Sequence, residues 1–371
     1  MDFSERPFLV IWETTKACDL ACVHCRASAD PYPGLNELTT AEAFRMIDSI
    51  AEMKTPILVF SGGDCLKRPD LPELIRYSKS KGLRTGAIPA VTPALTREKI
   101  HELRQTGLDQ IAFSLDAADP AEHDAFRRVS GVFAHTMEAV EWSRQCGLAV
   151  QINSLVNIHN TENLTLLLDL IENLGIVFWE VFFLVPVGRG TELPLLSAEK
   201  FEAAFEKIYE LSQRAPFIIK ITEAPHYRRF CIEKEMIKEG KDPRKAKFGE
   251  IDMPYYLRKT HGPHGSIGMA PQGVNAGKGF VFVSYEGEVY PSGFLPISAG
   301  NIRKTPLPEI YRDAPLFREL RDSALLKGRC GICPFRDICG GSRSRAYAVT
   351  GDYLAEDPSC VFQPGGVSVR S

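Results

Sequence analysis

The sequence predicts an α/β fold, in which a parallel sheet curves into a partial (β/α)6 barrel and a small cysteine-rich domain follows. Apolar, β-branched runs alternate with amphipathic helical stretches through the first half of the chain. Six such units fill roughly 180 residues, in keeping with the ~30 residues that a strand and its crossover helix need. Seven of the ten cysteines gather in two clusters, one near each end of the chain.

The six predicted strands are short apolar runs. They cover residues 8–13, 56–63, 83–89, 109–116, 148–156 and 177–186. Between the first two lies "TTAEAFRMIDSIAEM", which has the apolar spacing of a helix and in which Thr40 and Glu42 suit a helix start. Repeated alternation of strand and helix favours a parallel sheet. A flat, doubly wound sheet is the alternative to the barrel.

The alternation loosens after residue 187. The helical stretch "SAEKFEAAFEKIYELSQR" leads into a polar run with several Gly and Pro residues, which predicts a bridging segment over 216–274. The stretch "GKGFVFVSYEGEVYPSGF" then reads as a hairpin, because two alternating runs flank a turn. We therefore expect three parts, which are a barrel over 1–215, the bridge, and a C-terminal domain over 275–371.

Composition and charge narrow the class of protein. The 371 residues are 44% apolar and 25% charged, as in ordinary globular chains. A formal charge of −3 without long basic blocks argues against nucleic acid or anionic membrane as partners. No stretch approaches the roughly 20 apolar residues of a membrane span, and the N-terminus lacks a signal-peptide pattern. We expect a cytoplasmic protein, whose cysteines are ligands, redox groups or buried thiols rather than disulfides.

The first cysteine cluster directly follows the first predicted strand. Cys18, Cys22 and Cys25 form a Cys-x3-Cys-x2-Cys loop. A four-iron cluster takes one thiolate per iron, so three cysteines leave one iron open to a substrate. The loop falls at the C-terminal mouth of the barrel, where active sites of such barrels assemble. Three cysteines that merely line a core are the alternative.

The spacing and position of this triad resemble those of the radical S-adenosylmethionine (SAM) enzymes, whose core is a partial TIM-like barrel. The resemblance implies that the open iron of a [4Fe–4S] cluster chelates SAM, and that an electron from the cluster cleaves SAM to a 5′-deoxyadenosyl radical. It implies oxidoreductase or lyase chemistry and a flavodoxin- or ferredoxin-like electron donor. A non-catalytic iron–sulfur protein, either an electron carrier or a redox sensor, is the alternative of another class. The open iron argues against it.

Further segments resemble SAM-contacting motifs of that family in chain order. "SGGD" at 61–64 resembles the GGE motif, with Asp64 in place of the usual Glu. The resemblance implies SAM contacts from Gly62, Gly63, Asp64, Ser114, Asp116, Arg127, Asn153 and Val185. Each of these also suits a turn, a helix cap or a surface position. Cys65 follows the motif directly, so it is a candidate catalytic hydrogen-atom donor or ligand, with a packed thiol as the alternative.

The second cysteine cluster lies in the tail and consists of Cys330, Cys333, Cys339 and Cys360. Four thiolates suit zinc or an iron–sulfur cluster equally. The tail resembles the SPASM or twitch-like domain of radical SAM enzymes, which implies a second, auxiliary [4Fe–4S] cluster on these four cysteines. The further cluster of fully equipped members is not expected, because three of its cysteine positions hold Asn275, Ser292 and Arg343. The remaining auxiliary cluster would serve electron transfer or structural support.

The tail and the stretch "TEAPHYRR" resemble radical SAM enzymes that modify iron tetrapyrroles in alternative haem pathways, including iron-coproporphyrin decarboxylases. Such a substrate presents carboxylates around a flat apolar disc, which favours Arg forks beside aromatic surface. The candidate substrate-binding residues are Arg189, His226, Tyr227, Arg228 and Arg229. A solvated basic segment is the alternative for these residues. The alternative function is a SPASM-type maturase that oxidises or crosslinks a ribosomally made peptide.

Overall fold

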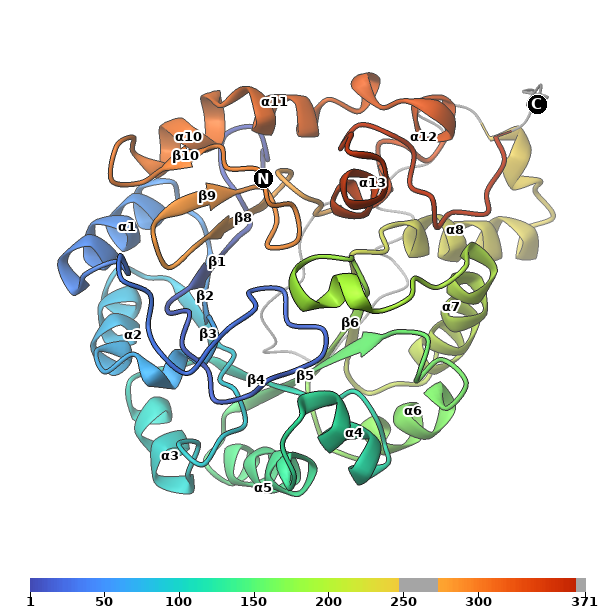
Figure 1. The fold of residues 1–371 in the computed structure, drawn as a ribbon. Helices are drawn as coiled ribbons and strands as arrows, with labels where there is room; N and C mark the ends of the chain where they lie inside the picture. The colour runs from blue at the N-terminus through green and yellow to red at the C-terminus, as the bar shows by residue number, and fades with distance from the viewer. Residues whose placement is uncertain (247–272, 365–371) are drawn as a thin grey trace.

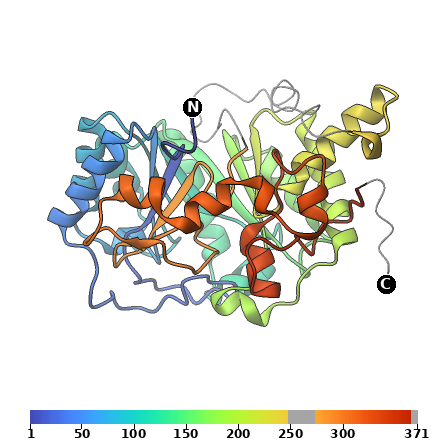
Figure 2. The same cartoon turned by 90° about the horizontal axis from the view of Figure 1, so that it is seen from above.

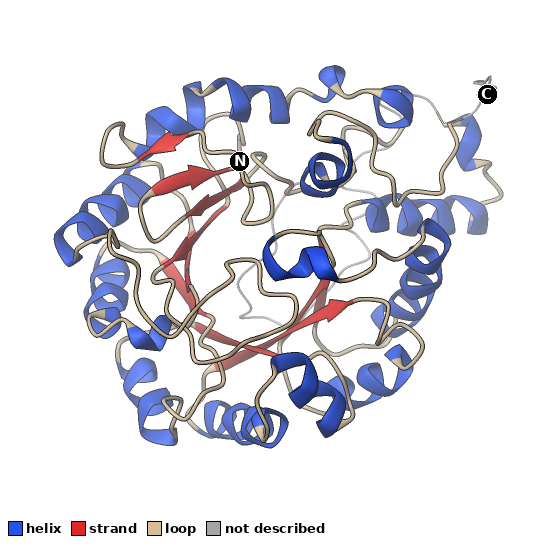
Figure 3. Cartoon of the chain, viewed as in Figure 1, coloured by secondary structure: helices blue, strands red, loops and turns tan. Residues whose placement is uncertain are grey.

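The computed structural model describes residues 1–246 and 273–364. One ten-stranded sheet has the order β10-β9-β8-β1-β2-β3-β4-β5-β6-β7. The sheet curves into an open barrel with helices around its outside (Figure 1), and Figure 3 shows the strands as a single arc. The strands from β1 to β7 lie in chain order without a reversal, so the predicted partial barrel is confirmed and the doubly wound sheet is excluded.

All six predicted strands are present, and each pairs in parallel with the next. They are β1 (Leu9–Glu13), β2 (Ile57–Ser61), β3 (Arg84–Ala87), β4 (Gln110–Ser114), β5 (Ala149–Val156) and β6 (Phe178–Phe183). Their apolar side chains form one core with those of the surrounding helices, in which Trp12, Phe113 and Trp179 are fully buried. Parallel strands covered on both faces read as continuous apolar runs, which is why the sequence predicts them well.

Helices follow the strands and cover the outside of the sheet. They are α1 (Thr40–Glu52), η1 (Cys65–Lys67), α2 (Leu71–Ser80), α3 (Arg97–Gln105), α4 (Pro120–Arg127), α5 (Val132–Gln145), α6 (Leu164–Glu172), η2 (Gly188–Glu192) and α7 (Ala198–Ser212). The predicted helix after the first strand is α1, but its cap is Thr39 rather than Thr40. The Thr39 side chain accepts from the Glu42 backbone, and the Glu42 carboxylate accepts from Thr39 in return.

A seventh strand and helix unit lies inside the predicted bridge. β7 (Ile218–Thr222) pairs in parallel with β6, and α8 (His226–Lys238) and η3 (Pro243–Lys245) follow it. The first part of the segment predicted as a polar bridge therefore extends the barrel. β7 lies at the end of the sheet and only Ile218 is buried along it, so its sequence lacks a continuous apolar run. Residues 247–272 of the predicted bridge lie outside the described residues.

The C-terminal part joins the same sheet. β8 (Phe280–Val283) pairs in parallel with β1, and β9 (Glu288–Tyr290) turns back antiparallel to β8, which confirms the predicted hairpin. β10 (Gly300–Asn301), α10 (Leu307–Asp313), α11 (Pro315–Arg321), η4 (Ser323–Leu325), α12 (Gly328–Ile332) and α13 (Arg343–Thr350) follow. These helices run across the open side of the barrel between β8 and α8 (Figures 1 and 2). The division of the chain at 215 and 275 stays a prediction.

None of the helices in the described part of the chain combines the length and apolar character that crossing a membrane requires.

Candidate functional site

A cavity of about 320 Å³ opens at the C-terminal ends of the parallel strands. Its walls come from the cysteine loop after β1, from the ends of β2, β4, β5, β6 and β7, and from residues around β8 and the loop at 292–294. This volume lies within the range of small-molecule sites. The cavity occupies the face of the barrel on which such folds build active sites.

The three cysteines of the first cluster all line this cavity. Each sulfur receives one N–H donor. The Leu20 backbone donates to the Cys18 Sγ at 3.4 Å, and the Ala29 backbone donates to the Cys25 Sγ at 3.5 Å. Nη1 of Arg127 reaches the Cys22 Sγ at 3.6 Å.

Donors aimed at three sulfurs on one wall fit a cluster held by thiolates. Burial raises the pKa of the Cys18 thiol to about 12. Without a bound cation this thiol stays protonated at neutral pH, so a positively charged iron centre is what would stabilise its thiolate. The residues present therefore fit the three-cysteine [4Fe–4S] cluster.

The predicted glycine pair packs directly under the cysteine loop. The Gly63 N–H donates to the Thr15 carbonyl at 2.8 Å. A Cβ on Gly63 would lie 2.4 Å from the Ala17 carbonyl oxygen and 2.5 Å from that of Lys16. Only glycine permits this approach. Gly62 and Gly63 both line the cavity, so they position the loop and expose backbone to the same space.

Asp64 and Cys65 follow the glycine pair, and neither of them lines the cavity. The Asp64 carboxylate accepts from Leu66 N at 3.1 Å, Ala90 N at 3.2 Å and Thr92 Oγ1 at 3.1 Å. Both oxygens of this carboxylate thus accept hydrogen bonds within the protein, and the side chain is directed away from the cavity that Gly62 and Gly63 line. Cys65 is fully buried in η1, and burial raises its pKa well above the usual value. This position favours the packed thiol over the predicted catalytic group.

The remaining predicted SAM contacts come together in the cavity. Ser114, Asp116, Arg127, Asn153 and Val185 all line it, although they come from β4, β5, α4 and the segment after β6. Arg127 forms an ion pair with Asp116, which also accepts from the Leu155 N–H at 2.8 Å. Burial by itself would raise the pKa of Asp116, but the Arg127 guanidinium, His24, His123 and the Leu155 N–H together outweigh burial, and the pKa is lowered. Nε of Arg127 has no hydrogen-bond partner among the described residues.

His24 also lines the cavity, although the sequence pattern pointed only to the thiols around it. Its ring stacks on Phe126 with centroids 4.6 Å apart and an interplanar angle of 7°. Burial lowers the pKa of His24 to about 3, so the ring is neutral at physiological pH. Its place between Cys22 and Cys25 could have predicted this position, because a residue inside a ligand loop lies beside the ligands.

The predicted substrate-binding residues separate into two places. Arg228 lines the main cavity. Arg189 does not; its Nε donates to the Cys22 carbonyl at 2.9 Å and its Nη1 to the Ala29 carbonyl at 3.2 Å, so it braces the cysteine loop. His226 and Arg229 are buried beside the tail cysteines instead.

The Arg229 side chain is not placed to bind substrate carboxylates, as was predicted, because it is buried and paired away from the main cavity. It is 3% exposed and forms ion pairs with Glu202 and Glu233. His226 is fully buried against Phe205, with the ring centroids 4.9 Å apart. Neither side chain reaches the main cavity. Tyr227 is buried as well and also packs on Phe205, at 5.2 Å.

Cationic and aromatic side chains that were not selected from the sequence line one wall of the main cavity. The Arg26 guanidinium lies over the Phe282 ring at 4.4 Å and pairs with Glu13. Lys220 on β7 pairs with Glu180 at 2.8 Å. The aromatic residues of this wall are Phe182, Phe280, Phe282 and Phe294. Arg26 was not selected from the sequence as a substrate-binding candidate, because only the cysteines beside it were considered. Lys220 was not selected, because the strand β7 that carries it was not predicted.

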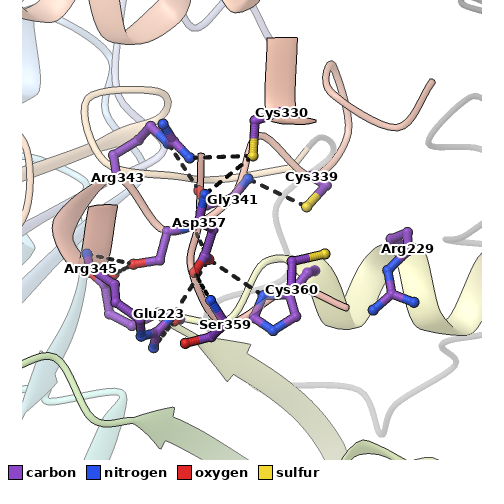
Figure 4. Close-up of polar contacts among 12 residues, drawn as sticks. Glu223, Arg229, Cys330, Cys339, Gly341, Arg343, Arg345, Asp357, Ser359 and Cys360 are labelled. Carbon is purple, nitrogen blue, oxygen red and sulfur yellow. Dashed lines mark hydrogen bonds and ion pairs between the residues drawn. The ribbon is translucent and has the colours of Figure 1, made fainter. Parts of the chain in front are cut away.

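The four tail cysteines line a second, smaller cavity beside α8 and α12. The Gly341 N–H points at the Cys339 Sγ from 3.4 Å, and the Asp357 N–H at the Cys330 Sγ from 3.4 Å (Figure 4). Burial raises the pKa of Cys333 to about 12 and that of Cys360 to about 11. Sulfurs that share one cavity and receive backbone donors fit an iron–sulfur cluster.

A zinc ion is a poorer match for the tail. Zinc would hold each of the four sulfurs at about 2.3 Å. Within the part of the chain that the structure describes, no three His, Cys, Asp or Glu side chains converge as the ligands of a single ion would. The sulfurs instead stand around a cavity, which suits a larger multi-iron group.

The three residues at the missing cysteine positions form hydrogen bonds within the protein. Asn275 Nδ2 donates to the Gly341 carbonyl at 2.9 Å, and Ser292 Oγ donates to Glu223 at 2.9 Å. Arg343 donates to the Tyr353 carbonyl at 2.9 Å. Ser292 thus connects the C-terminal part to the segment after β7, whereas Asn275 and Arg343 bond within the C-terminal part. None of the three is a thiolate that could hold iron.

Comparison with known proteins identifies the family. Residues 12–174 match the model of the radical SAM superfamily, and residues 275–334 match that of the SPASM iron–sulfur cluster-binding domain. The AdoMet-dependent heme synthase of Methanosarcina barkeri (strain Fusaro) is 41% identical over 359 residues, which are 97% of either chain. The Fe-coproporphyrin III synthase of the same organism is 30% identical over 367 residues, 95% of this chain and 87% of that one.

Among solved structures, Streptococcus suis SuiB bound to S-adenosylmethionine matches with a TM-score of 0.73 at 14% identity. The match covers 96% of this chain and 78% of SuiB. At this level of identity the similarity concerns the fold, which is the same open barrel with a C-terminal extension.

Proposed function

Because the chain belongs to the radical SAM superfamily, in the family that includes the AdoMet-dependent heme synthase of Methanosarcina barkeri, we propose that it modifies an iron tetrapyrrole in haem biosynthesis. The proposed reaction decarboxylates or removes carboxylate side chains of that substrate. A [4Fe–4S] cluster on Cys18, Cys22 and Cys25 would supply the electron that cleaves SAM. A flavodoxin- or ferredoxin-like protein is the proposed source of that electron. The main support for this proposal is that the cysteine triad and a wall of aromatic and cationic side chains line the same cavity.

SAM would lie on the side of the cavity formed by the cysteine loop, the glycine pair and the ends of β4 and β5. Arg127 is suited to receive the SAM carboxylate, because its Nε faces no protein acceptor among the described residues. Asp116 fixes the orientation of that guanidinium through their ion pair. Asn153 and Ser114, at the ends of adjacent strands, offer an amide and a hydroxyl for the ribose.

The tetrapyrrole would lie on the opposite side, against the phenylalanine wall. Phe182 and Phe294 stand 6.2 Å apart on this wall, and Phe282 carries Arg26 on its face. Flat apolar rings bury large areas against such side chains. This wall therefore suits the disc of the substrate, while its carboxylates reach toward Arg26, Lys220 and Arg228.

Arg26 is the residue we propose for direct contact with a substrate carboxylate. A guanidinium has five N–H donors in a fixed fork, so Arg26 can keep Glu13 and still bind a second carboxylate. Its position directly after Cys25 would bring that carboxylate close to the SAM site. The reacting side chain would then be held near the group that attacks it.

An Arg26→Gln variant is expected to bind iron-coproporphyrin at least ten-fold more weakly than the native chain. Hydrogen bonds to charged groups contribute roughly 1.5–3 kcal/mol, and 1.4 kcal/mol corresponds to about ten-fold in affinity. An absorbance titration of the tetrapyrrole against anaerobic protein measures the change in Kd.

Arg214→Gln is the matched control, since Arg214 is an exposed arginine that pairs with Glu172 and does not line the cavity. It should bind the tetrapyrrole like the native chain. Equal affinities for the Arg26→Gln variant and the native chain would contradict the proposed contact.

A further inference from the structure

Arg343 is a fully buried arginine without a carboxylate partner. It is 2% exposed, and it donates to the carbonyls of Tyr353 at 2.9 Å and Ala355 at 2.7 Å. No carboxylate of the described residues lies within 4.0 Å of its guanidinium, whereas the neighbouring Arg345 pairs with Asp357 at 3.4 Å. A charge that is removed from water normally has a partner of opposite sign.

The guanidinium of Arg343 points at a tail cysteine. Nη2 lies 3.8 Å from the Cys330 Sγ (Figure 4). Gly341, with a φ of +65°, leaves the space for this approach. A Cβ at Gly341 would lie 2.4 Å from Arg343 Nη2 and 3.2 Å from the Cys330 Sγ. The absence of a side chain at Gly341 therefore allows the Arg343 guanidinium to approach the Cys330 sulfur.

The other buried arginines around the tail cysteines have carboxylate partners. Arg229 is matched by Glu202 and Glu233, and Arg345 by Asp357. Arg343 differs from them, because no carboxylate oxygen of the described residues lies within 4.0 Å of its guanidinium. The Asp352 carboxylate, on which its charge acts from farther away, is partly exposed and pairs with Lys327 at 2.6 Å. Four thiolates at the tail centre would place negative charge directly beside Arg343.

We propose that Arg343 is a positioning residue whose buried charge balances the tail centre and raises the reduction potential of the iron–sulfur cluster on the four cysteines. Reduction adds one negative charge to the cluster, and a nearby cation in a region of low dielectric stabilises the more negative state. Hydrogen bonding and local charge are known determinants of cluster potential. Arg343 thus occupies a position that the resemblance assigns to a cysteine in fully equipped members, and it acts on the neighbouring centre. This inference does not depend on the identity of the substrate.

An anaerobic redox titration followed by electron paramagnetic resonance tests the proposal on the full-length protein with both clusters loaded. In Arg343→Gln the ratio of reduced to oxidised tail cluster at a fixed potential should fall ten-fold or more, equivalent to about 59 mV for one electron. Arg343→Lys keeps the charge and should stay closer to the native potential. The cluster on Cys18, Cys22 and Cys25 serves as the internal reference and should not shift.

Arg329→Gln is the matched control. Arg329 also lines the tail cavity, but it is partly exposed and pairs with Glu356 at 3.0 Å, so solvent and a carboxylate screen its charge. A smaller shift than in Arg343→Gln supports the proposal, and an equal shift overturns it.

The native potential in Arg343→Gln, or equal shifts in the Gln and Lys variants, would also overturn the proposal. If Arg343→Gln fails to hold its tail cluster, retention of that cluster in Arg343→Lys supports the need for a cation. Loss of the cluster in both variants overturns it.

Discussion

A chain in which Cys18, Cys22 and Cys25 are all replaced by alanine is expected to lose SAM cleavage completely. These three sulfurs line the main cavity and each receives an N–H donor, so no other described group can take over their role. Anaerobic incubation with SAM and dithionite, followed by chromatography of 5′-deoxyadenosine, measures the loss. The tail cluster should remain, because its four cysteines line a separate cavity.

Cys146→Ala is the control for replacing a thiol. Cys146 caps the end of α5 and donates its S–H to the Ser143 carbonyl at 3.3 Å, and it does not line the cavity. It should cleave SAM at the native rate. Formation of 5′-deoxyadenosine by the triple variant would refute the assignment of the triad.

The native chain should bind about eight irons after anaerobic reconstitution, four for each of two clusters. Cys333→Ala combined with Cys339→Ala should halve this number, because both sulfurs line the tail cavity. Measurement of iron and zinc in the purified protein gives the count.

Two other metal contents would contradict this assignment of the clusters. About twelve irons would mean a third cluster, and thus ligands other than the seven assigned cysteines. About four irons with one zinc would make the tail a structural zinc site, and Arg343 would then have no redox centre to tune.

The sequence predicted the elements whose side chains are buried on all sides. β5 and β6 are mostly buried and rich in apolar residues, because both faces of the parallel sheet are covered. β7 was missed because, along "IIKIT", polar residues alternate with apolar ones and only the first residue is buried. A strand at the end of a sheet needs no continuous apolar run, so its pattern is weak.

For the basic stretch of α8, the sequence revealed the cationic and aromatic residues but not which of them face the cavity and which are buried. His226, Arg229 and Phe230 lie at i, i+3 and i+4, which places them on one face of the helix, and all three are buried. Arg228 lies off that face and lines the cavity. Helical spacing could have separated these residues, but the charge of the run suggested an exposed surface.

The candidate site residues were indicated by the resemblance to the radical SAM enzymes. Parallel pairing explains why they meet, since the cysteine triad and the glycine pair follow β1 and β2, and Ser114 and Asn153 lie side by side on β4 and β5. Asp64 was misplaced because the chain turns into η1 directly after the glycines, which directs its carboxylate to Ala90 and Thr92. The roles proposed for Arg26 and Arg343 rest on contacts with Phe282 and with the Cys330 sulfur, which no local pattern reveals.

The most direct test of the proposed function is mass spectrometry of an anaerobic reaction that contains the native protein, iron-coproporphyrin, SAM and a reductant. We predict that the tetrapyrrole loses carboxyl groups as carbon dioxide and that 5′-deoxyadenosine accumulates with it. In a parallel reaction, candidate precursor peptides should keep their mass. An unchanged tetrapyrrole beside an oxidised or crosslinked peptide would contradict the proposal and favour a peptide maturase.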